Sequence, residues 1–448
     1  MSLTLNVPSR ADAPRLAGLP VAVIGAGPVG LAAAAHLLER GIDVTVYEAG
    51  PVAGSAIRSW GHTRLFSPWQ HVVNAASVRL LKKSGWQAPP ADTLPTGAEL
   101  LEQYVLPLAA TAELSSRIVY NTRVTAVSRQ GMDRTRSTGR ADTPFVLRLA
   151  GAQGTIQQHA RAVIDASGTY SSPNPLNASG LPLTADTEVA AAISHALPDV
   201  LGSERERFAG KHTLVVGAGH SAANTLLKLA ELARAVPGTT VTWAIRGADP
   251  VRVYGSDEDA LEARGRLGNA THELVREGVV ALIDRFEIDD LQPADHGRVR
   301  VLGRRAGESA TIEADVVVNA TGFRPDLDML REIRLSLDEV VEAPRLLAPL
   351  IDPNVHSCGT VPPHGVAELS HPEPNFFLAG MKSYGRAPTF LLLTGYEQVR
   401  SIAAEIAGDH AAARAVQLVL PETGVCSSGA SNDAAGCCGS PAAGGGCS

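Results

Sequence analysis

Cysteine is nearly absent from the body of this 448-residue chain, and its few copies are unevenly placed. Cys358 is the only cysteine in the first 425 residues, and the last 23 residues hold the other four: Cys426, Cys437, Cys438 and Cys447. Because stabilising disulfides need pairs spread through a fold, this distribution excludes a disulfide-bonded extracellular domain. Aromatic residues are also scarce, at 4% of the chain, so any local concentration of them carries information.

Long apolar runs and blocks of like charge are missing as well. No stretch approaches the roughly 20 apolar residues of a membrane-spanning helix, and the first 16 residues lack the apolar core of a signal peptide. The net charge is −7, from 39 basic and 46 acidic residues, with no basic block. Nucleic acid and membrane are therefore unexpected partners, and we expect a cytoplasmic protein of two or three domains.

The sequence before residue 50 has the pattern of a dinucleotide-binding turn. A β-branched apolar run leads into a glycine-rich turn, a helix-forming stretch and a second apolar strand that ends in an acid. Gly25 permits the tight turn, Gly27 lets a pyrophosphate approach the backbone, and Gly30 lets helix and strand pack closely. The acid would bind a ribose, and the helix start would bind the phosphates. The candidate binding residues are Gly25, Gly27, Pro28, Gly30 and Glu48.

A second turn of the same kind follows a short strand that begins at residue 213. Gly217, Gly219 and Ser221 occupy its turn, and Ala222 stands at the third glycine position, which the fingerprint tolerates. The next strand ends in Arg246 instead of an acid. A guanidinium binds a 2′-phosphate through parallel hydrogen bonds, whereas an acid would repel it. The second site should therefore prefer NADPH to NADH.

Three further apolar strands run into glycine turns, at residues 162–168, 315–322 and 375–380. They add Gly168, Gly322 and Gly380 to the candidate binding residues. A helix over residues 394–406 follows the last of them and should point its N-terminus at an anionic group. Two glycine-rich turns, each paired with a later strand that ends in glycine, imply two nucleotide-binding domains, one inserted in the other.

Periodicity predicts the elements between these motifs. We expect amphipathic helices over residues 75–83 and 97–108. Alternation over residues 118–127 and 145–149 predicts strands of an antiparallel meander, with residues 131–142 as a polar hairpin loop.

An aromatic segment interrupts the first domain at residues 60–69, which hold two of the four tryptophans. One interpretation is a loop that plugs the core. The other is that its side chains line a cofactor ring or a substrate pocket. The candidates for this neighbourhood are Trp60, Arg64, Phe66 and Trp69, and no catalytic residue is named beyond them.

In order and content these motifs resemble the flavoproteins with two dinucleotide-binding domains, which include thioredoxin reductases and flavin-containing monooxygenases. The resemblance covers residues 19–412 and implies an α/β fold of two Rossmann-like domains, FAD on the first fingerprint and NADPH on the second. It departs from the family where Ser55 and Met381 replace a usual glycine and aspartate. The implied divisions are residues 1–18 as a disordered lead, 19–204 and 325–415 as the FAD-binding domain, 205–324 as the NADPH-binding domain, and 416–448 as a flexible tail.

The number and position of the cysteines predict which branch of this family the chain resembles. A disulfide reductase needs two cysteines beside its flavin, and the core has only Cys358. Residues 167–175 also resemble a monooxygenase segment, with Ser167 in place of threonine. In such monooxygenases NADPH reduces FAD, O2 adds at the flavin C4a position, and the protein supplies position and exclusion of solvent. We therefore expect an NADPH-dependent flavin monooxygenase.

The cysteine-rich tail leaves alternatives open. It cannot form a core, and its thiols (Cys426, Cys437, Cys438, Cys447) suit a soft, thiophilic ion. Together with residues 60–69 it resembles flavin monooxygenases of arsenic-resistance gene clusters, which implies a metalloid as substrate or inducer. One alternative is a reductase that passes electrons to Cys437 and Cys438 or to a thiol-bound metalloid, and another is a non-enzymatic metalloid-binding flavoprotein. The expected partners are a small-molecule or metalloid substrate and O2; whether the chain forms a homodimer is open.

Overall fold

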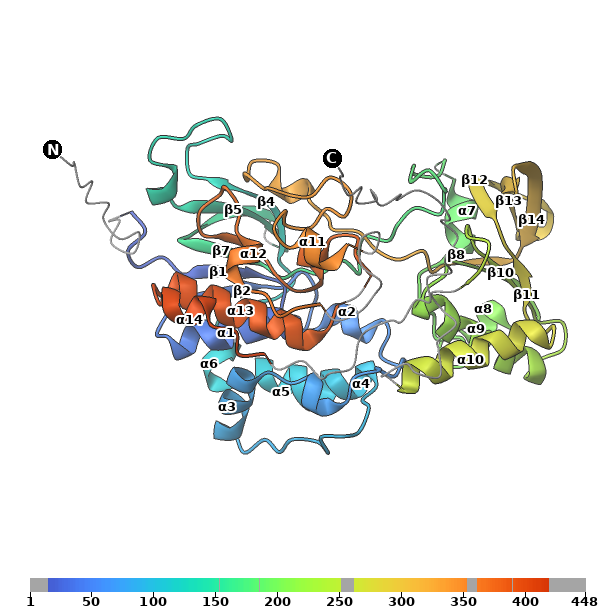
Figure 1. Ribbon diagram of the computed structural model, residues 1–448, viewed down its shortest axis with the longest axis horizontal. Helices are drawn as coiled ribbons and strands as arrows, with labels where there is room; N and C mark the ends of the chain where they lie inside the picture. The colour runs from blue at the N-terminus through green and yellow to red at the C-terminus, as the bar shows by residue number, and fades with distance from the viewer. Residues whose placement is uncertain are drawn as a thin grey trace, which may run out of the picture.

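The protein consists of two α/β lobes that share one architectural plan (Figure 1). The computed structural model describes residues 15–152, 154–184, 186–250, 262–352, 361–388 and 390–418, with the side chains of 262–265 left out. A five-stranded parallel sheet forms the centre of each lobe, in the order β16-β7-β1-β2-β3 in the first and β11-β10-β9-β15-β8 in the second. A three-stranded antiparallel meander accompanies each, β4-β5-β6 and β12-β13-β14. The predicted α/β fold of two Rossmann-like domains is confirmed.

The first lobe contains the elements from both ends of the described chain. Its elements before the crossing to the second lobe are β1 (Val21–Ile24), α1 (Pro28–Glu39), β2 (Val44–Tyr47), α2 (Ser55–Arg58), η2 (Trp69–His71), α3 (Ala75–Lys83), α4 (Gly97–Leu100), η3 (Leu101–Val105), α5 (Leu106–Ala109), α6 (Ala112–Ser115), β3 (Ile118–Val119), β4 (Arg123–Arg129), η4 (Arg140–Asp142), β5 (Phe145–Gly151), β6 (Gly154–Ala160) and β7 (Ala162–Asp165). Those after the return are η6 (Asp328–Leu330), α11 (Ala348–Ile351), α12 (Val366–Leu369), β16 (Phe376–Leu378), η7 (Gly380–Tyr384), α13 (Leu392–Ile406) and α14 (His410–Arg414).

The second lobe is built from the stretch between them. Its elements are α7 (Thr187–Ala192), β8 (Ile193–Ser194), α8 (Arg205–Phe208), β9 (His212–Val216), α9 (His220–Ala235), β10 (Thr240–Ala244), α10 (Glu262–Arg276), β11 (Ala281–Ile283), β12 (Phe286–Pro293), η5 (Asp295–Gly297), β13 (Val299–Arg305), β14 (Glu308–Ala314) and β15 (Val316–Asn319). Although β8 precedes residue 205, where the predicted second domain begins, it pairs with β15 at the edge of this sheet.

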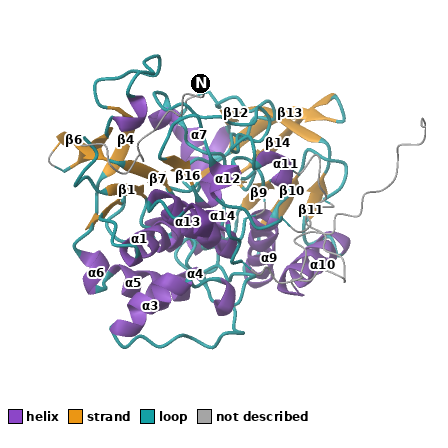
Figure 2. Ribbon diagram, turned by 60° about the vertical axis from the view of Figure 1, so that its left-hand side comes forward, coloured by secondary structure: helices purple, strands orange, loops and turns teal. Residues whose placement is uncertain are grey.

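Each central strand is apolar on both faces because both faces are covered. Val21 and Val23 of β1 join the core beneath α1 and α13, whereas Ala22 and Ile24 join the core beneath the meander. In the second lobe Val215 likewise faces α9, and the strand's other face packs against β12–β14. Both lobes are therefore three-layered, with helices on one side of the parallel sheet and a meander on the other (Figure 2).

Several predicted elements are confirmed. Helix α3 spans the predicted residues 75–83 and is capped by Asn74, whose side chain accepts a hydrogen bond from the Ser77 N–H at 3.1 Å. The predicted helix 97–108 is present but includes the π-helical turn η3. Pro107 has no N–H to donate to the carbonyl of Gln103, four residues earlier. The indole N–H of Trp86 donates to that carbonyl instead, at 2.6 Å.

Other expectations need correction. The predicted single strand over residues 118–127 is wrong, because Asn121, with a φ of 50°, separates two strands. The first, β3, pairs in parallel with β2, and only the second, β4, belongs to the meander. Strand β6 was not predicted because its sequence is largely polar and exposed at the sheet edge. Residues 15–18 of the predicted disordered lead form a turn in which Leu16 is buried.

A buried ion-pair cluster joins the first meander to the segment before β16. Glu373 accepts hydrogen bonds from the guanidinium groups of Arg129, at 2.8 Å, and Arg140, at 2.8 to 3.1 Å. All three side chains are at most 3% exposed. Hydrogen bonds from both arginines hold the pKa of Glu373 low against the opposing effect of its burial. Removing Glu373 would leave two buried guanidinium groups without their shared carboxylate, so this cluster ties the first meander to the segment that leads into β16.

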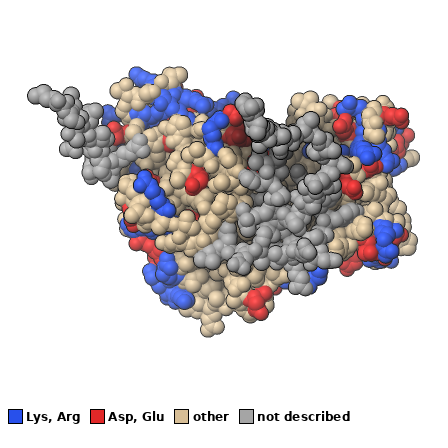
Figure 3. Space-filling model, viewed as in Figure 1, with Lys and Arg blue, Asp and Glu red and all other residues tan. Residues whose placement is uncertain are grey.

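The surface charges are mixed. On the face shown in Figure 3, Lys and Arg side chains are interspersed with Asp and Glu. The second meander illustrates this, with ion pairs from Arg304 to Glu287 at 3.2 Å and from Arg305 to Asp284 at 2.7 Å. Among the described residues, none of the helices combines the length and apolar character needed to cross a membrane.

Two buried histidines make stability depend on pH. Burial lowers the pKa of His36 to about 4 and that of His371 to about 4. The folded state therefore favours their neutral forms, and stability is complete above the unfolded pKa of about 6.5 and is lost as pH falls toward 4. At pH 5 each histidine should cost about 2 kcal/mol, because the unfolded chain binds a proton that the folded chain excludes.

We predict that lowering the pH from 7 to 5 reduces the free energy of unfolding of FAD-saturated protein, measured by urea denaturation. His371→Gln should weaken this pH dependence, and the double variant with His36→Gln should weaken it further, whatever the absolute stability of either. An unchanged pH dependence in the double variant would show that these histidines are not its source.

Candidate functional site

The first glycine-rich turn joins β1 to α1 and is shaped by close backbone packing. Gly25 has a φ of 97°, and a Cβ there would lie 2.9 Å from the carbonyl oxygen of Ala166. A Cβ on Gly30 would lie 2.0 Å from the Gly25 carbonyl oxygen. Gly27, by contrast, has open space where its Cβ would point, and it precedes Pro28 at a helix start that has no side-chain cap. An uncapped helix start beside open space fits a pyrophosphate.

Glu48 lies directly after β2, and its side chain contacts the backbone of this turn. Its carboxylate oxygens accept hydrogen bonds from the N–H groups of Ala26 and Gly50, both at 2.8 Å. A carboxylate has further lone pairs that can accept a ribose hydroxyl. The geometry therefore fits the predicted role of Glu48.

The segment around Gly380 lies next to the first glycine-rich turn, at the start of α1. Gly380 has a φ of 69°, and its Cβ would lie 3.3 Å from the side chain of Val29, in the first turn of α1. A Cβ on Gly395, in the first turn of α13, would lie 2.8 Å from the same side chain. The starts of α1 and α13 are therefore adjacent, and their partial positive charges add at one end of the sheet.

A buried ion pair that we did not predict lies beside this turn. The ammonium of Lys382, in η7, donates hydrogen bonds to the Asp165 carboxylate at 2.7 Å and to the Ser167 hydroxyl at 3.1 Å. Both charged side chains are fully buried, whereas Ser167 is exposed. Because residues 165 and 382 are far apart in sequence, no local pattern could have revealed the pair. It joins the end of β7 to the Gly380 segment.

The second glycine-rich turn joins β9 to α9 in the same way. Gly217 has a φ of 129°, and a Cβ there would lie 2.1 Å from the carbonyl oxygen of Ala320. The indole N–H of Trp243 donates to the Gly217 carbonyl at 2.7 Å. Gly219 precedes α9 with open space around it and no side-chain cap at the helix start, which Ser221 follows in the first turn. This turn also fits a pyrophosphate.

Arg246 lies two residues past the end of β10, one residue beyond the position that Glu48 occupies after β2. Its guanidinium is exposed and donates one hydrogen bond, to the carbonyl of Ala178 at 3.2 Å. Its remaining N–H groups include donors for an incoming phosphate. The geometry agrees with a preference for NADPH.

The two strand-end turns are built alike. The Asp165 carboxylate accepts hydrogen bonds from the N–H of Ser167, at 3.1 Å, and its hydroxyl, at 2.7 Å. The Asn319 side chain accepts the same two from Thr321, at 3.2 and 2.7 Å. Gly168 and Gly322 follow with φ values of 71° and 95°. The chain segments that follow these two turns are the two linkers between the lobes, and they contain Pro173 and Phe323.

The linkers cross as an antiparallel pair. Pro173 forms a β-bridge with Phe323. The Asn174 side chain donates to the Thr321 carbonyl at 3.1 Å, and Asn319 donates to the Asn174 carbonyl at 2.9 Å. The crossing therefore ties both strand-end turns, and with them both glycine-rich turns, to one region between the lobes.

The aromatic segment has several roles. Trp69 is buried in the first lobe at 4% exposure, and Trp60 packs against Gly97. Arg64 donates to the Leu94 carbonyl and lies 3.9 Å from Glu99. Phe66 reaches the second lobe. The core-plug interpretation therefore describes Trp69, while the predicted cofactor-facing role of these side chains stays a prediction.

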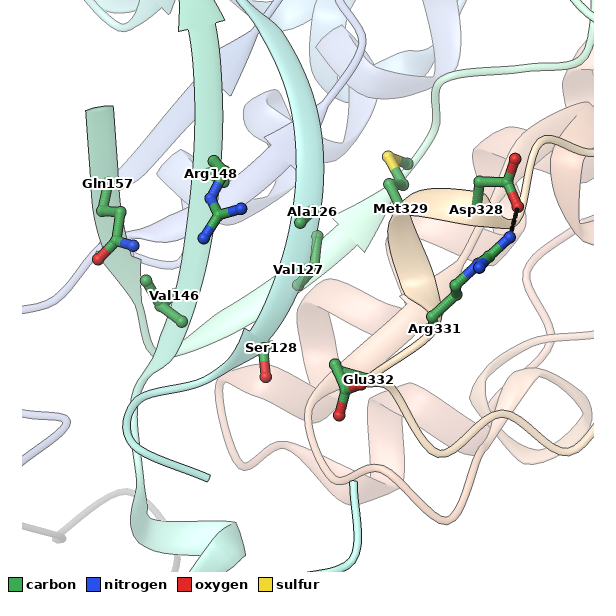
Figure 4. A pocket seen from close by; sticks show the side chains of 10 residues that line it. All are labelled: Ala126, Val127, Ser128, Val146, Arg148, Gln157, Asp328, Met329, Arg331 and Glu332. Carbon is green, nitrogen blue, oxygen red and sulfur yellow. Dashed lines mark hydrogen bonds and ion pairs between the residues drawn. The ribbon is translucent and has the colours of Figure 1, made fainter. Parts of the chain in front are cut away.

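The tail candidates Cys426, Cys437, Cys438 and Cys447 lie outside the described residues, as does Cys358. Within the part of the chain that the structure describes, no group of three His, Cys, Asp or Glu side chains could hold a metal ion. A pocket of about 320 Å³ lies between β4–β6 and η6, lined by residues such as Arg148, Gln157 and Met329 (Figure 4). None of its lining residues belongs to either nucleotide turn, and we assign it no role.

The chain belongs to the family described as pyridine nucleotide-disulphide oxidoreductase, whose model matches residues 22–348. It is an oxidoreductase with FAD and NADPH as cofactors, as the resemblance implied. A ferredoxin–NADP reductase from Salinispora tropica is 28% identical over 71% of this chain and 78% of its own length.

Two solved structures are also similar. A bacillithiol disulfide reductase from Bacillus cereus has a TM-score of 0.64 and 21% identity, over 87% of this chain and 99% of its own. A cadaverine monooxygenase of desferrioxamine biosynthesis from Erwinia amylovora, bound to FAD, has a TM-score of 0.61 and 15% identity, over 90% and 98%. At these identities the two structures show the fold alone.

We predict that Gly217→Ala weakens NADP+ binding at least 10-fold while bound FAD is retained, because a Cβ at this φ would overlap the Ala320 carbonyl. Isothermal titration calorimetry with NADP+ and the visible flavin absorbance measure the two effects. Gly238→Ala is the matched control, since Gly238 has a φ of 86° but no atom within 3.7 Å of the added Cβ. Equal losses in both variants would refute a specific role for the Gly217 turn.

We predict that Arg246→Ala lowers kcat/KM for NADPH by about 10- to 100-fold, the effect of losing a hydrogen bond to a charged phosphate, and leaves kcat/KM for NADH nearly unchanged. Steady-state kinetics with both nucleotides give the ratio. Arg234→Gln, at an exposed arginine in the last turn of α9, should not alter it. A parallel loss with NADPH and NADH would place the 2′-phosphate elsewhere.

Proposed function

We propose that this protein is an NADPH-dependent flavin monooxygenase. The observation that carries the proposal is that none of the described residues is a cysteine, those around the first nucleotide turn included, and that residues 1–357 of the sequence contain none. A disulfide reductase of the dithiol type needs a cysteine pair beside its flavin. Electrons that reach the flavin here have O2 as the simplest acceptor.

The residues of the first lobe would hold and orient FAD. The adjacent starts of α1 and α13 favour the negative pyrophosphate, and Glu48 would bind the ribose. Ser167, whose hydroxyl is held by Asp165 and Lys382, is an exposed residue beside the Gly25 turn. When bound, FAD accepts a hydride from NADPH and, once reduced, can transfer oxygen from O2 to a substrate. The protein contributes position and exclusion of water.

A reductase is the second candidate, favoured by the 28% identity to a ferredoxin–NADP reductase. Its acceptor would be an external protein or, in another form, the tail thiols Cys437 and Cys438 or a metalloid bound to them. A metalloid substrate and a non-enzymatic metalloid-binding role both depend on this tail, which lies outside the described residues, and both stay predictions.

The test is stopped-flow mixing of the NADPH-reduced, FAD-loaded protein with O2. We expect a third spectral species, distinct from reduced and oxidised flavin, before the oxidised spectrum returns. Direct return to the oxidised spectrum would contradict the monooxygenase proposal.

The double variant Cys437→Ser/Cys438→Ser separates the candidates. It should oxidise NADPH with O2 at the wild-type rate if the proposal holds, whereas loss of all turnover would support the tail-thiol reductase. Tight binding of As(III) by the wild-type tail, with negligible NADPH oxidation under any acceptor, would support the non-enzymatic role.

A further inference from the structure

Residues 61–71 form an extension of the first lobe, which we call the finger. Its backbone pairs with residues 90–98. The Leu65 N–H donates to the Pro95 carbonyl at 2.8 Å, and the Gly97 N–H donates to the Thr63 carbonyl at 2.9 Å. Trp69 anchors the base of the finger in the core of the first lobe. Its conformation is therefore fixed by the lobe to which it belongs.

The finger touches the second lobe at its nucleotide turn. The ring of Phe66 lies edge-on to the ring of His220, with centroids 5.5 Å apart and an interplanar angle of 66°. Phe66 also packs against the core of the second lobe beneath α9. His220 is the first residue of α9, between Gly219 and Ser221, so Phe66 contacts the very turn whose N–H groups would hold the NADPH pyrophosphate. In Figure 1 the chain after α2 extends toward the second lobe.

An electrostatic interaction also links the finger to the second lobe. Burial raises the pKa of Asp199, but hydrogen bonds from Ser203 and the charge of His62 together bring it below its usual value. His62 is in the finger, and Asp199 is in the second lobe after β8. Two residues of the finger therefore interact with the second lobe, Phe66 through ring packing and His62 through charge.

This contact supplements the crossing of the linkers. Two lobes that are joined only where their linkers cross can rotate about that crossing, and rotation would change the distance between two bound cofactors. A packed contact elsewhere opposes this rotation. Hydride transfer needs close approach, and a displacement of about 1 Å can cost about 100-fold in rate.

We propose that Phe66 is a positioning residue of the NADPH site, supplied by the FAD-binding lobe. By packing against His220, it holds the turn that would bind the NADPH pyrophosphate at a fixed position relative to the flavin. The proposal rests on the FAD and NADPH assignment and not on the proposed reaction with O2. Its test is therefore made without O2, and its failure would leave the monooxygenase proposal untouched.

The test compares Phe66→Ala, Phe66→Tyr and, as a control, Gln70→Ala at an exposed residue of the same finger. Calorimetry with NADP+ on FAD-loaded protein should show Phe66→Ala binding about 2- to 10-fold more weakly, the range for losing an edge-to-face aromatic pair. Anaerobic stopped-flow reduction by NADPH should be slowed by about 10-fold or more. Phe66→Tyr should keep both values close to those of the wild type, and Gln70→Ala should match the wild type.

A double-mutant cycle with His220→Ala identifies the contact itself. If the two side chains act through each other, the double variant should bind NADP+ no more weakly than His220→Ala alone. Bound FAD and the melting temperature check that the finger still folds. Wild-type NADP+ binding and reduction in Phe66→Ala, or additive effects in the cycle, would overturn the proposal.

Discussion

The close approach of each nucleotide turn to the strand-end turn beside it is the constraint on which the rest of the structure depends. A Cβ on Gly25 would meet the Ala166 carbonyl oxygen, and a Cβ on Gly217 would meet that of Ala320. Only glycine permits both the positive φ and this separation. The contacts fix β7 beside β1 and β15 beside β9, and the turns at the strand ends then set the course of both linkers.

The two lobes apply the same plan to different ligands. Strands β1, β2, β3 and β7 correspond to β9, β10, β11 and β15, and a meander is inserted at the same point in each. The differences lie in the side chains around the shared backbone. The first lobe has Glu48, and the charged pair Asp165 and Lys382, whereas the second has Arg246 and the neutral Asn319. We propose that these side chains let one scaffold distinguish FAD from a nucleotide that carries a 2′-phosphate.

Local sequence was sufficient to predict the nucleotide turns and the elements next to them. Glycine spacing identified both turns, and apolar runs identified the strands, because these signals act over a few residues. Contacts between distant residues were beyond its reach. The pairs Asp165 with Lys382 and Arg129 with Glu373 are separated by more than 200 residues, and the ring contact of Phe66 with His220 depends on how two lobes meet. Polar edge strand β6 carried no apolar pattern to detect.

The central claim is that NADPH on the second lobe delivers its electrons to FAD on the first. Anaerobic titration of the FAD-loaded protein with NADPH tests it most directly. The account predicts that the visible absorbance of the flavin is lost at one NADPH per chain. Flavin that stays oxidised with NADPH but is reduced by dithionite would contradict it, because the two nucleotide sites would then not be in communication.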